Sequence, residues 1–181
     1  MTTLKHIIPL VALSCITHFG YCQDGHLSSR KGKSSLGVGI GLPYGAIGIR
    51  AGTNLIEGLN LFGGLGYQIA GIGYNVGLRK DFPSSNATQF YMTGMYGTNA
   101  ATKVKGLSEY NRVYTGATFG GGVKINSWGV EGNYWDLGLL IPIRSSEFRD
   151  AEQAMKNDPR VSDLSTAWPV LIVVGYNFTI Q

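Results

Sequence analysis

The sequence predicts an all-β protein in which eight antiparallel strands close into an up-and-down barrel. Glycine accounts for 27 of the 181 residues and proline for only 6, while charged residues make up 14%. Glycine weakens helices, whereas glycine, tyrosine and β-branched residues together suit closely packed, twisted strands. The chain also alternates large apolar residues with small or polar ones over eight successive runs, and turn residues separate these runs.

The eight runs follow one another along residues 34–181, which we predict to form a single barrel domain. The predicted strands cover residues 36–42, 47–54, 59–69, 72–79, 89–103, 117–125, 128–141 and 170–180. The seventh run loses its alternation near Asp136, and we expect a β-bulge beside Gly138 to restore the phase. An even number of strands brings both ends of a closed barrel to the same rim.

The apolar faces of these strands are predicted to point outward, toward lipid. The opposite faces carry glycine, threonine, asparagine and isolated charges, a set too small and too polar to fill a soluble core. Runs of about 9–11 residues suit tilted strands that cross a bilayer, and a closed barrel leaves no unpaired edge in hydrocarbon. The sequence therefore predicts a transmembrane β-barrel. A soluble periplasmic lipocalin-like carrier is an alternative, but its calyx would have to be lined with glycine and charge.

The N-terminal residues predict a secretory signal peptide over 1–22, followed by a polar, basic tail over 23–33. Lys5 precedes an apolar stretch, 7–16, that is too short to span a bilayer as a helix. A rival interpretation is a lipoprotein signal in which Cys15 is acylated in place of cleavage after Cys22. The chain has no other cysteine, so the secreted protein is not expected to depend on disulfides.

The charge balance does not call for a nucleic-acid partner, and we expect none. The full chain carries +4, and Lys5 is the only charged residue before Gln23, which leaves about +3 after cleavage. Nucleic-acid-binding surfaces are more densely basic and are interleaved with aromatic residues. The partner that the pattern implies is outer-membrane lipid, and any protein partner in the envelope is left unidentified.

Strand parity places a polar cluster in the predicted barrel interior. Its predicted members are Arg50, Arg79, Lys124, Glu131 and Asn133. A charge in so narrow a space is costly unless it is paired, so we expect Glu131 to pair with one or more of the cations and to plug the lumen. The surplus of cations favours an alternative, a narrow anion-preferring pore or transport accessory.

The connections between the predicted strands indicate an orientation. The turns after the second, fourth and sixth strands are short, and the connections after the fifth and seventh are longer. In outer-membrane barrels the short turns are periplasmic, which places both termini in the periplasm. The longest connection, 145–168, carries Phe148, Ala151 and Met155 at helical spacing before Pro159, so we expect a short helix there.

Over residues 34–181 the chain resembles the small eight-stranded outer-membrane β-barrel proteins of Gram-negative bacteria, the OmpA-like and OmpX-like group, in its strand pattern and at its C-terminus. The residues that carry the resemblance are Gly175, Tyr176, Phe178 and Ile180, which are similar to the signal read by the barrel-assembly machinery. Two departures stand beside them. Val173 occupies a position where a polar residue is usual, and the chain ends on Ile180-Gln181 and not on an aromatic residue.

The distribution of histidine argues against an enzyme. The chain has only His6, His18 and His26, which all precede the predicted barrel. Outer-membrane barrel enzymes of similar architecture depend on a histidine, as a general base or for related chemistry. We therefore expect no catalytic residues, no metal site and no cofactor, and a structural or interaction role in the outer membrane.

Overall fold

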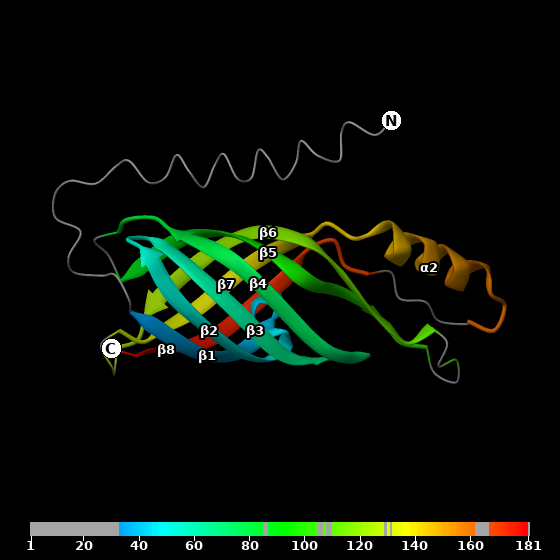
Figure 1. Cartoon of the computed structure of the whole chain (residues 1–181), viewed down its shortest axis with the longest axis horizontal. Helices are drawn as coiled ribbons and strands as arrows, with labels where there is room; N and C mark the ends of the chain where they lie inside the picture. The colour runs from blue at the N-terminus through cyan, green and yellow to red at the C-terminus, as the bar shows by residue number, and fades with distance from the viewer. Residues whose placement is uncertain are drawn as a thin grey trace, which may run out of the picture.

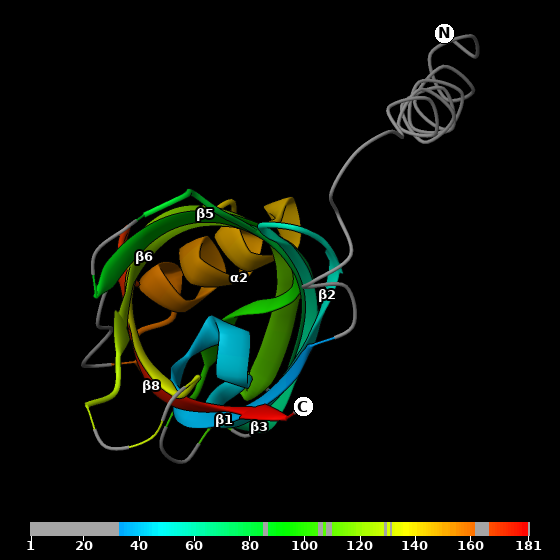
Figure 2. The same ribbon diagram turned by 90° about the vertical axis from the view of Figure 1, so that its left-hand side faces the viewer.

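The computed structural model describes residues 33–84, 87–104, 107, 110–128, 130, 132–161 and 167–180. The eight strands pair in sequence order, each antiparallel to its neighbours, and close into a barrel (Figures 1 and 2). They are β1 (Ser34–Gly41), β2 (Ala46–Ile56), β3 (Leu59–Gln68), β4 (Gly71–Asp81), β5 (Thr88–Thr102), β6 (Arg112–Asn126), β7 (Tyr134–Pro142) and β8 (Leu171–Ile180). The predicted fold is confirmed. The predicted signal peptide, with Cys15 and Cys22, and nearly all of the predicted tail lie outside the described residues.

The outer surface of the barrel is apolar, as the alternation predicted. Ile69, Ile72 and Phe90 have 70%, 69% and 66% of their surface exposed, and most outward positions on the strands carry similar side chains. The inward positions are buried, including Arg50 and Arg79 at 2% exposure each. This is the reverse of a soluble protein, which buries its large apolar side chains.

The seventh strand is shorter and more regular than the sequence predicted. It begins at Tyr134, and it pairs without interruption with β6 and β8, so the bulge expected beside Gly138 is wrong. Trp128 and Val130 lie in the connection before it, and Tyr134 faces the lumen. The alternation seemed to break near Asp136 because the predicted strand, 128–141, included part of the connection that precedes β7. This connection turns at Gly132, which has a φ of 89°.

Bulges are found elsewhere, where the alternation gave no sign of them. The pairing of β2 with β3 shifts between Asn54 and Ile56, and that of β5 with β6 shifts between Thr98 and Ala100. The extra residue in β5 is Asn99, which is 3% exposed. A bulge bends the strand and redirects a side chain, and here it turns the Asn99 amide inward.

The connection between β1 and β2 folds into the barrel. Leu42–Tyr44 form a short 3-10 helix, η3, whose three side chains are buried, and Figure 2 shows it inside the ring of strands. The prediction that Leu42 continues the outward face of the first strand is therefore wrong. The chain leaves the lumen through Gly45 and Ala46, with φ values of 69° and 86°, a conformation that is costly for alanine.

The helix expected in the longest connection is confirmed as α2 (Ser146–Asn157). The Ser145 hydroxyl caps it by accepting a hydrogen bond from the Phe148 backbone N–H. Phe148 and Met155 are buried, and the Phe148 ring meets the Tyr114 ring edge-on at 5.3 Å. Figure 1 places α2 at the end of the barrel opposite the C-terminus, where β5 and β6 extend beyond the other strands. Of the helices within the described residues, none has the length and apolar character to span a membrane.

Candidate functional site in the barrel lumen

Asp136, on β7, is the centre of a buried cluster in the lumen. Its side chain is 1% exposed and lies within hydrogen-bonding distance of four donors. Tyr91 donates to Oδ1 at 2.6 Å, while Arg50, Arg79 and Tyr44 donate to Oδ2 at 3.0, 3.3 and 3.3 Å. The four donors come from β5, β2, β4 and η3, so one carboxylate joins β7 to three other strands and to the short helix inside the barrel.

Each arginine has further partners around its guanidinium. The Arg50 guanidinium donates to Asn60 Oδ1 at 3.2 Å and lies 4.3 Å from the Phe62 ring centroid. The Arg79 guanidinium donates to the Tyr134 hydroxyl at 2.9 Å, and its Nε lies 3.2 Å from Asp81 Oδ1. Planar guanidinium groups suit such sites because they can donate in several directions and stack on rings.

A further ion pair lies toward the end of the barrel that holds the termini. Lys124 Nζ lies 2.6 Å from Asp81 Oδ2 and 4.7 Å from the Tyr134 ring centroid. We refer to five charged residues inside the barrel as the lumen cluster: the cations Arg50, Arg79 and Lys124 and the carboxylates Asp81 and Asp136. The formal charge of the lumen cluster is +1.

An apolar layer lies against the lumen cluster, which the sequence did not predict. Its members share buried positions on the inner faces of the strands or on η3: Leu42, Tyr44, Phe62, Met95, Leu140 and Val173. Tyr44 links the two layers, because its hydroxyl donates to Asp136 and accepts from Asn177 Nδ2 at 2.8 Å. The predicted polar interior thus has an apolar layer beside it, and packing in this layer gives the unusual Val173 a physical role.

The sequence-predicted cluster is only partly assembled in one place. Arg50, Arg79 and Lys124 lie in the lumen, whereas Asn133 lies at the barrel end, where its Oδ1 accepts from the Thr179 backbone N–H at 3.2 Å. Glu131 lies outside the described residues. The acids that hold the cations are Asp81 and Asp136. Strand parity would have found Asp136 had the seventh strand been started at Tyr134.

The four residues of the predicted assembly signal lie on the two faces of β8. Phe178 and Ile180 are exposed on the outer surface, at 45% and 53%. The Tyr176 ring meets the Phe178 ring edge-on at 5.0 Å. Gly175 faces the lumen, where a Cβ would lie 2.7 Å from Tyr44 Cε2, too close for real atoms. Gly175 therefore makes the space that η3 needs.

The geometry of the lumen cluster suits structural cross-linking. The Asp136 carboxylate already accepts hydrogen bonds from two guanidinium groups and two phenols, so most of its acceptor capacity is used within the barrel. Within the described residues, no group of three or more His, Cys, Asp or Glu side chains is placed to bind a metal ion.

Comparisons with known proteins give one structural similarity. The N-terminal β-barrel domain of Pseudomonas aeruginosa OprF is similar to this chain, with a TM-score of 0.47 and 16% sequence identity. The similarity covers 83% of this chain and 100% of that domain. No protein-family model matches the chain, and no curated protein matches it. At this level of similarity nothing about residue roles or function carries over from that domain to this chain.

Proposed function

We propose that this protein is an integral outer-membrane β-barrel with a closed lumen, a structural or interaction role and no catalytic activity. The observation that carries the proposal is the combination of an apolar outer surface with a lumen occupied by η3 and cross-linked through Asp136. An exterior of this kind needs lipid, and an interior of this kind holds the wall together without a substrate.

The dimensions of the strands support the membrane location. A ten-residue strand such as β8 is roughly 34 Å long, and a tilt of about 40° reduces its height to roughly 26 Å. The apolar band of outer-membrane barrels is about 25 Å tall. The outward aliphatic residues also oppose the soluble-carrier alternative, which requires them inside.

The filled lumen favours a plug over an anion-preferring pore. Arg50, Arg79 and Asp136 are each at most 2% exposed, so their charges are directed at one another and not at a water column. Removing these groups from water is costly, and the cost is offset only when the ions stay paired and hydrogen-bonded. An ion that passed through would have to break these pairs.

Conductance in planar lipid bilayers tests the closed lumen. The purified barrel, refolded into lipid, is expected to give no steady openings at 100 mV in 1 M KCl. Refolding is checked beforehand by the change in gel mobility between unheated and boiled samples. Steady anion-selective openings from the wild-type protein would instead assign it to the pore class.

We further propose that both termini face the periplasm and that α2 faces outward. Ser34 pairs with Ile180, so the ends of the barrel lie at one rim, and α2 lies at the other. Gln153→Cys in α2 and Glu57→Cys in the β2–β3 turn provide matched exposed sites. A membrane-impermeant maleimide is expected to label only Gln153→Cys in intact cells and both variants after lysis. The reverse pattern would invert the orientation.

The C-terminal strand is proposed to serve also as the signal for the barrel-assembly machinery. Phe178 and Ile180 present apolar side chains on the outer face of the strand that closes the barrel. Phe178→Ser changes this face without touching the lumen. Such a variant is expected to refold in vitro at the wild-type yield but to accumulate less in the outer membrane of cells.

A further inference from the structure

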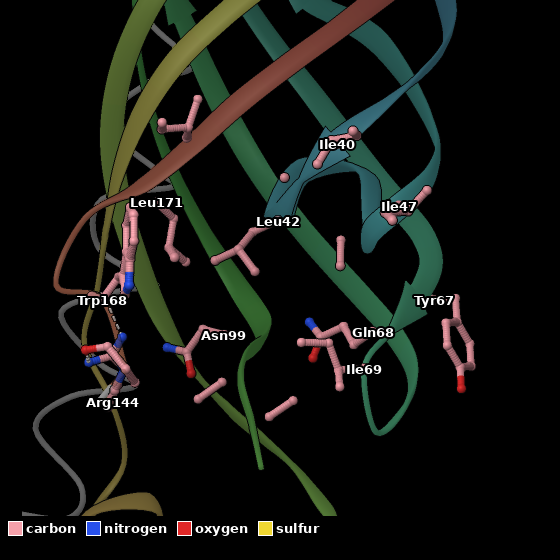
Figure 3. Close-up of a pocket in the computed structure, with 16 residues that line it drawn as sticks. Ile40, Leu42, Ile47, Tyr67, Gln68, Ile69, Asn99, Arg144, Trp168 and Leu171 are labelled. Carbon is pink, nitrogen blue, oxygen red and sulfur yellow. Dashed lines mark hydrogen bonds between the residues drawn. The ribbon is translucent and has the colours of Figure 1, made fainter. Parts of the chain in front are cut away.

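Pockets at the two ends of the barrel differ in their linings. The pocket near α2 has a volume of about 530 Å³ and a mainly apolar lining, of which Figure 3 shows Ile40, Ile47 and Leu171. The pocket at the end that holds the termini has a volume of about 360 Å³ and is lined mainly by polar and charged residues. We call this second pocket the turn pocket, because residues of the β2–β3 turn and of the β4–β5 connection line it.

Two cations and two carboxylates line the turn pocket, so its formal charge is zero: Lys80, Lys124, Glu57 and Asp81. Lys124 and Asp81 form an ion pair at 2.6 Å, and their side chains are only 14% and 10% exposed. Lys80 and Glu57, by contrast, are exposed, and among the described residues neither side chain has a hydrogen-bond or ion-pair partner. The turn pocket therefore offers a ligand an accessible cation and an accessible anion that are not engaged with each other.

Gly58, in the β2–β3 turn, makes room for the Lys80 ammonium. A Cβ on Gly58 would lie 3.3 Å from Lys80 Nζ and 2.9 Å from the Asp81 carbonyl oxygen, so the ammonium lies over the turn. The turn itself is held against β4 by a hydrogen bond of 2.7 Å from the Asp81 backbone N–H to the Gly58 carbonyl. The φ of Gly58 is 70°, a conformation that residues with a Cβ rarely adopt. This turn thus leaves the ammonium at the mouth of the turn pocket.

The outward face of β4 changes from apolar to charged at Lys80. The outward residues that precede it on this strand are all exposed and apolar or aromatic: Ile72, Tyr74, Val76 and Leu78. On the neighbouring strand β3, Leu61 pairs with Leu78, and Leu59 pairs with Lys80. An apolar strip therefore runs along β3 and β4 and ends at the turn pocket. An alkyl chain that lies on this strip brings its polar end to Lys80.

We propose that the turn pocket binds the head group of a phospholipid that carries a primary ammonium, with its phosphate beside Lys80 and its ammonium beside Glu57. The phosphate supplies acceptors for the lysine, and the ammonium supplies donors for the carboxylate. The acyl chains lie on the apolar strip of β3 and β4. A lysine at the edge of an apolar surface can reach head groups while its stem stays beside the chains. The proposal rests on the membrane location proposed above.

The balanced charge of the turn pocket selects against other phospholipid head groups. Phosphatidylglycerol supplies no cation for Glu57 and adds an unbalanced anion near Glu57 and Asp81. Phosphatidylcholine has the same charges as phosphatidylethanolamine, but its quaternary ammonium has no N–H group to donate to the carboxylate. Because an ion pair between exposed groups contributes little free energy, we expect a preference of about threefold to fivefold for phosphatidylethanolamine over either of the others.

Native mass spectrometry of the refolded full barrel, released from detergent micelles, measures this preference. The barrel is mixed with equal amounts of phosphatidylethanolamine, phosphatidylglycerol and phosphatidylcholine that share the same acyl chains, and the bound lipids are distinguished by mass. We expect phosphatidylethanolamine to be retained above the other two by the factor given above. Free phosphoethanolamine at the same concentration is expected not to displace it, because the free head group lacks the chains. Displacement would assign the turn pocket to a soluble ligand and overturn the proposal.

Matched variants at the two rims separate the turn pocket from general adhesion of lipid. Glu57→Gln is expected to remove the preference for phosphatidylethanolamine over phosphatidylcholine, and Lys80→Gln is expected to lower the retention of both. Lys103→Gln and Glu147→Gln, at exposed positions of the opposite rim, are expected to behave as the wild type does.

Equal retention of the three lipids by the wild type, a preference that survives both turn-pocket variants, or the same loss in the control variants would each overturn the proposal. A barrel that shows the gel-mobility change in micelles but no lipid preference contradicts the lipid site alone, and it leaves the conductance and labelling tests unaffected. A barrel that shows no gel-mobility change contradicts the membrane location and the lipid site with it.

Discussion

Replacing Asp136 with asparagine tests whether this one carboxylate holds the lumen together. Asp136→Asn keeps the size of the side chain but removes the charge that faces Arg50 and Arg79 at 3.0 and 3.3 Å. The formal charge of the lumen cluster rises from +1 to +2, and two buried guanidinium groups lose their shared anion. Removing one partner of a buried ion pair typically costs 3–5 kcal/mol, and we expect a loss of about this size.

The opposite substitution, Arg50→Met, provides the informative comparison. It lowers the formal charge of the lumen cluster to 0, and Asp136 keeps Arg79, Tyr91 and Tyr44 as donors. The expected cost is that of a charged hydrogen bond, about 1.5–3 kcal/mol. The structure therefore predicts an asymmetry in which loss of the acid destabilises more than loss of the base. Asp150→Asn on the exposed face of α2 is the matched control, with an expected effect within about 0.5 kcal/mol.

Urea unfolding of the barrel in lipid vesicles measures these differences. Tryptophan fluorescence and gel mobility together follow the folded fraction, and the free energy of unfolding is extrapolated to zero denaturant. The double variant is expected to lose less than the sum of the two single variants, because the side chains interact directly. A loss of under about 1 kcal/mol for Asp136→Asn, or a loss equal to that of Arg50→Met, would refute the reasoning and indicate a wet, weakly coupled lumen.

Three further predictions test the exterior, the plug and the helix. Val76 lies at the middle of β4 and is 59% exposed, and Val76→Arg is expected to lower the free energy of unfolding in lipid by about 2–4 kcal/mol. Phe82→Arg, beyond the end of the strand, is expected to lower it by about 0–1 kcal/mol. Equal losses for the two variants would contradict a lipid-facing surface. Gly175→Ala is expected to displace Tyr44 and open the lumen to ions in planar bilayers, since a Cβ there overlaps the ring; an unchanged closed state would show that η3 is no plug. Hydrogen bonds from Arg160 hold the pKa of Asp158 below its ordinary value of 3.8, so their stabilising contribution is complete above pH 4 and is lost as the pH falls through the lowered pKa. Amide exchange at the end of α2 should therefore accelerate in acid, and an Asp158→Asn variant should lack this pH dependence.

The sequence by itself determined the number of strands and the direction of their faces. The period of two along runs such as 71–81 places Ile72, Tyr74 and Val76 on one side, and the glycine-rich opposite face predicts that this side faces outward. Helical spacing and Pro159 likewise located α2. These features are local, because each depends on residues that are close together in the sequence.

Only the tertiary structure decided what fills the lumen. The inward turn at Gly41, the contact of Tyr44 with Asp136 at a separation of 92 residues, and the space beside Gly175 depend on strands that meet only when the barrel closes. The same holds for the partners of Arg50 and Arg79. The alternation along a strand places a side chain in the lumen, but it does not determine which residue on another strand that side chain contacts. Local alternation is set by the geometry of a single strand, whereas pairing across the lumen is set by register and closure of the whole barrel.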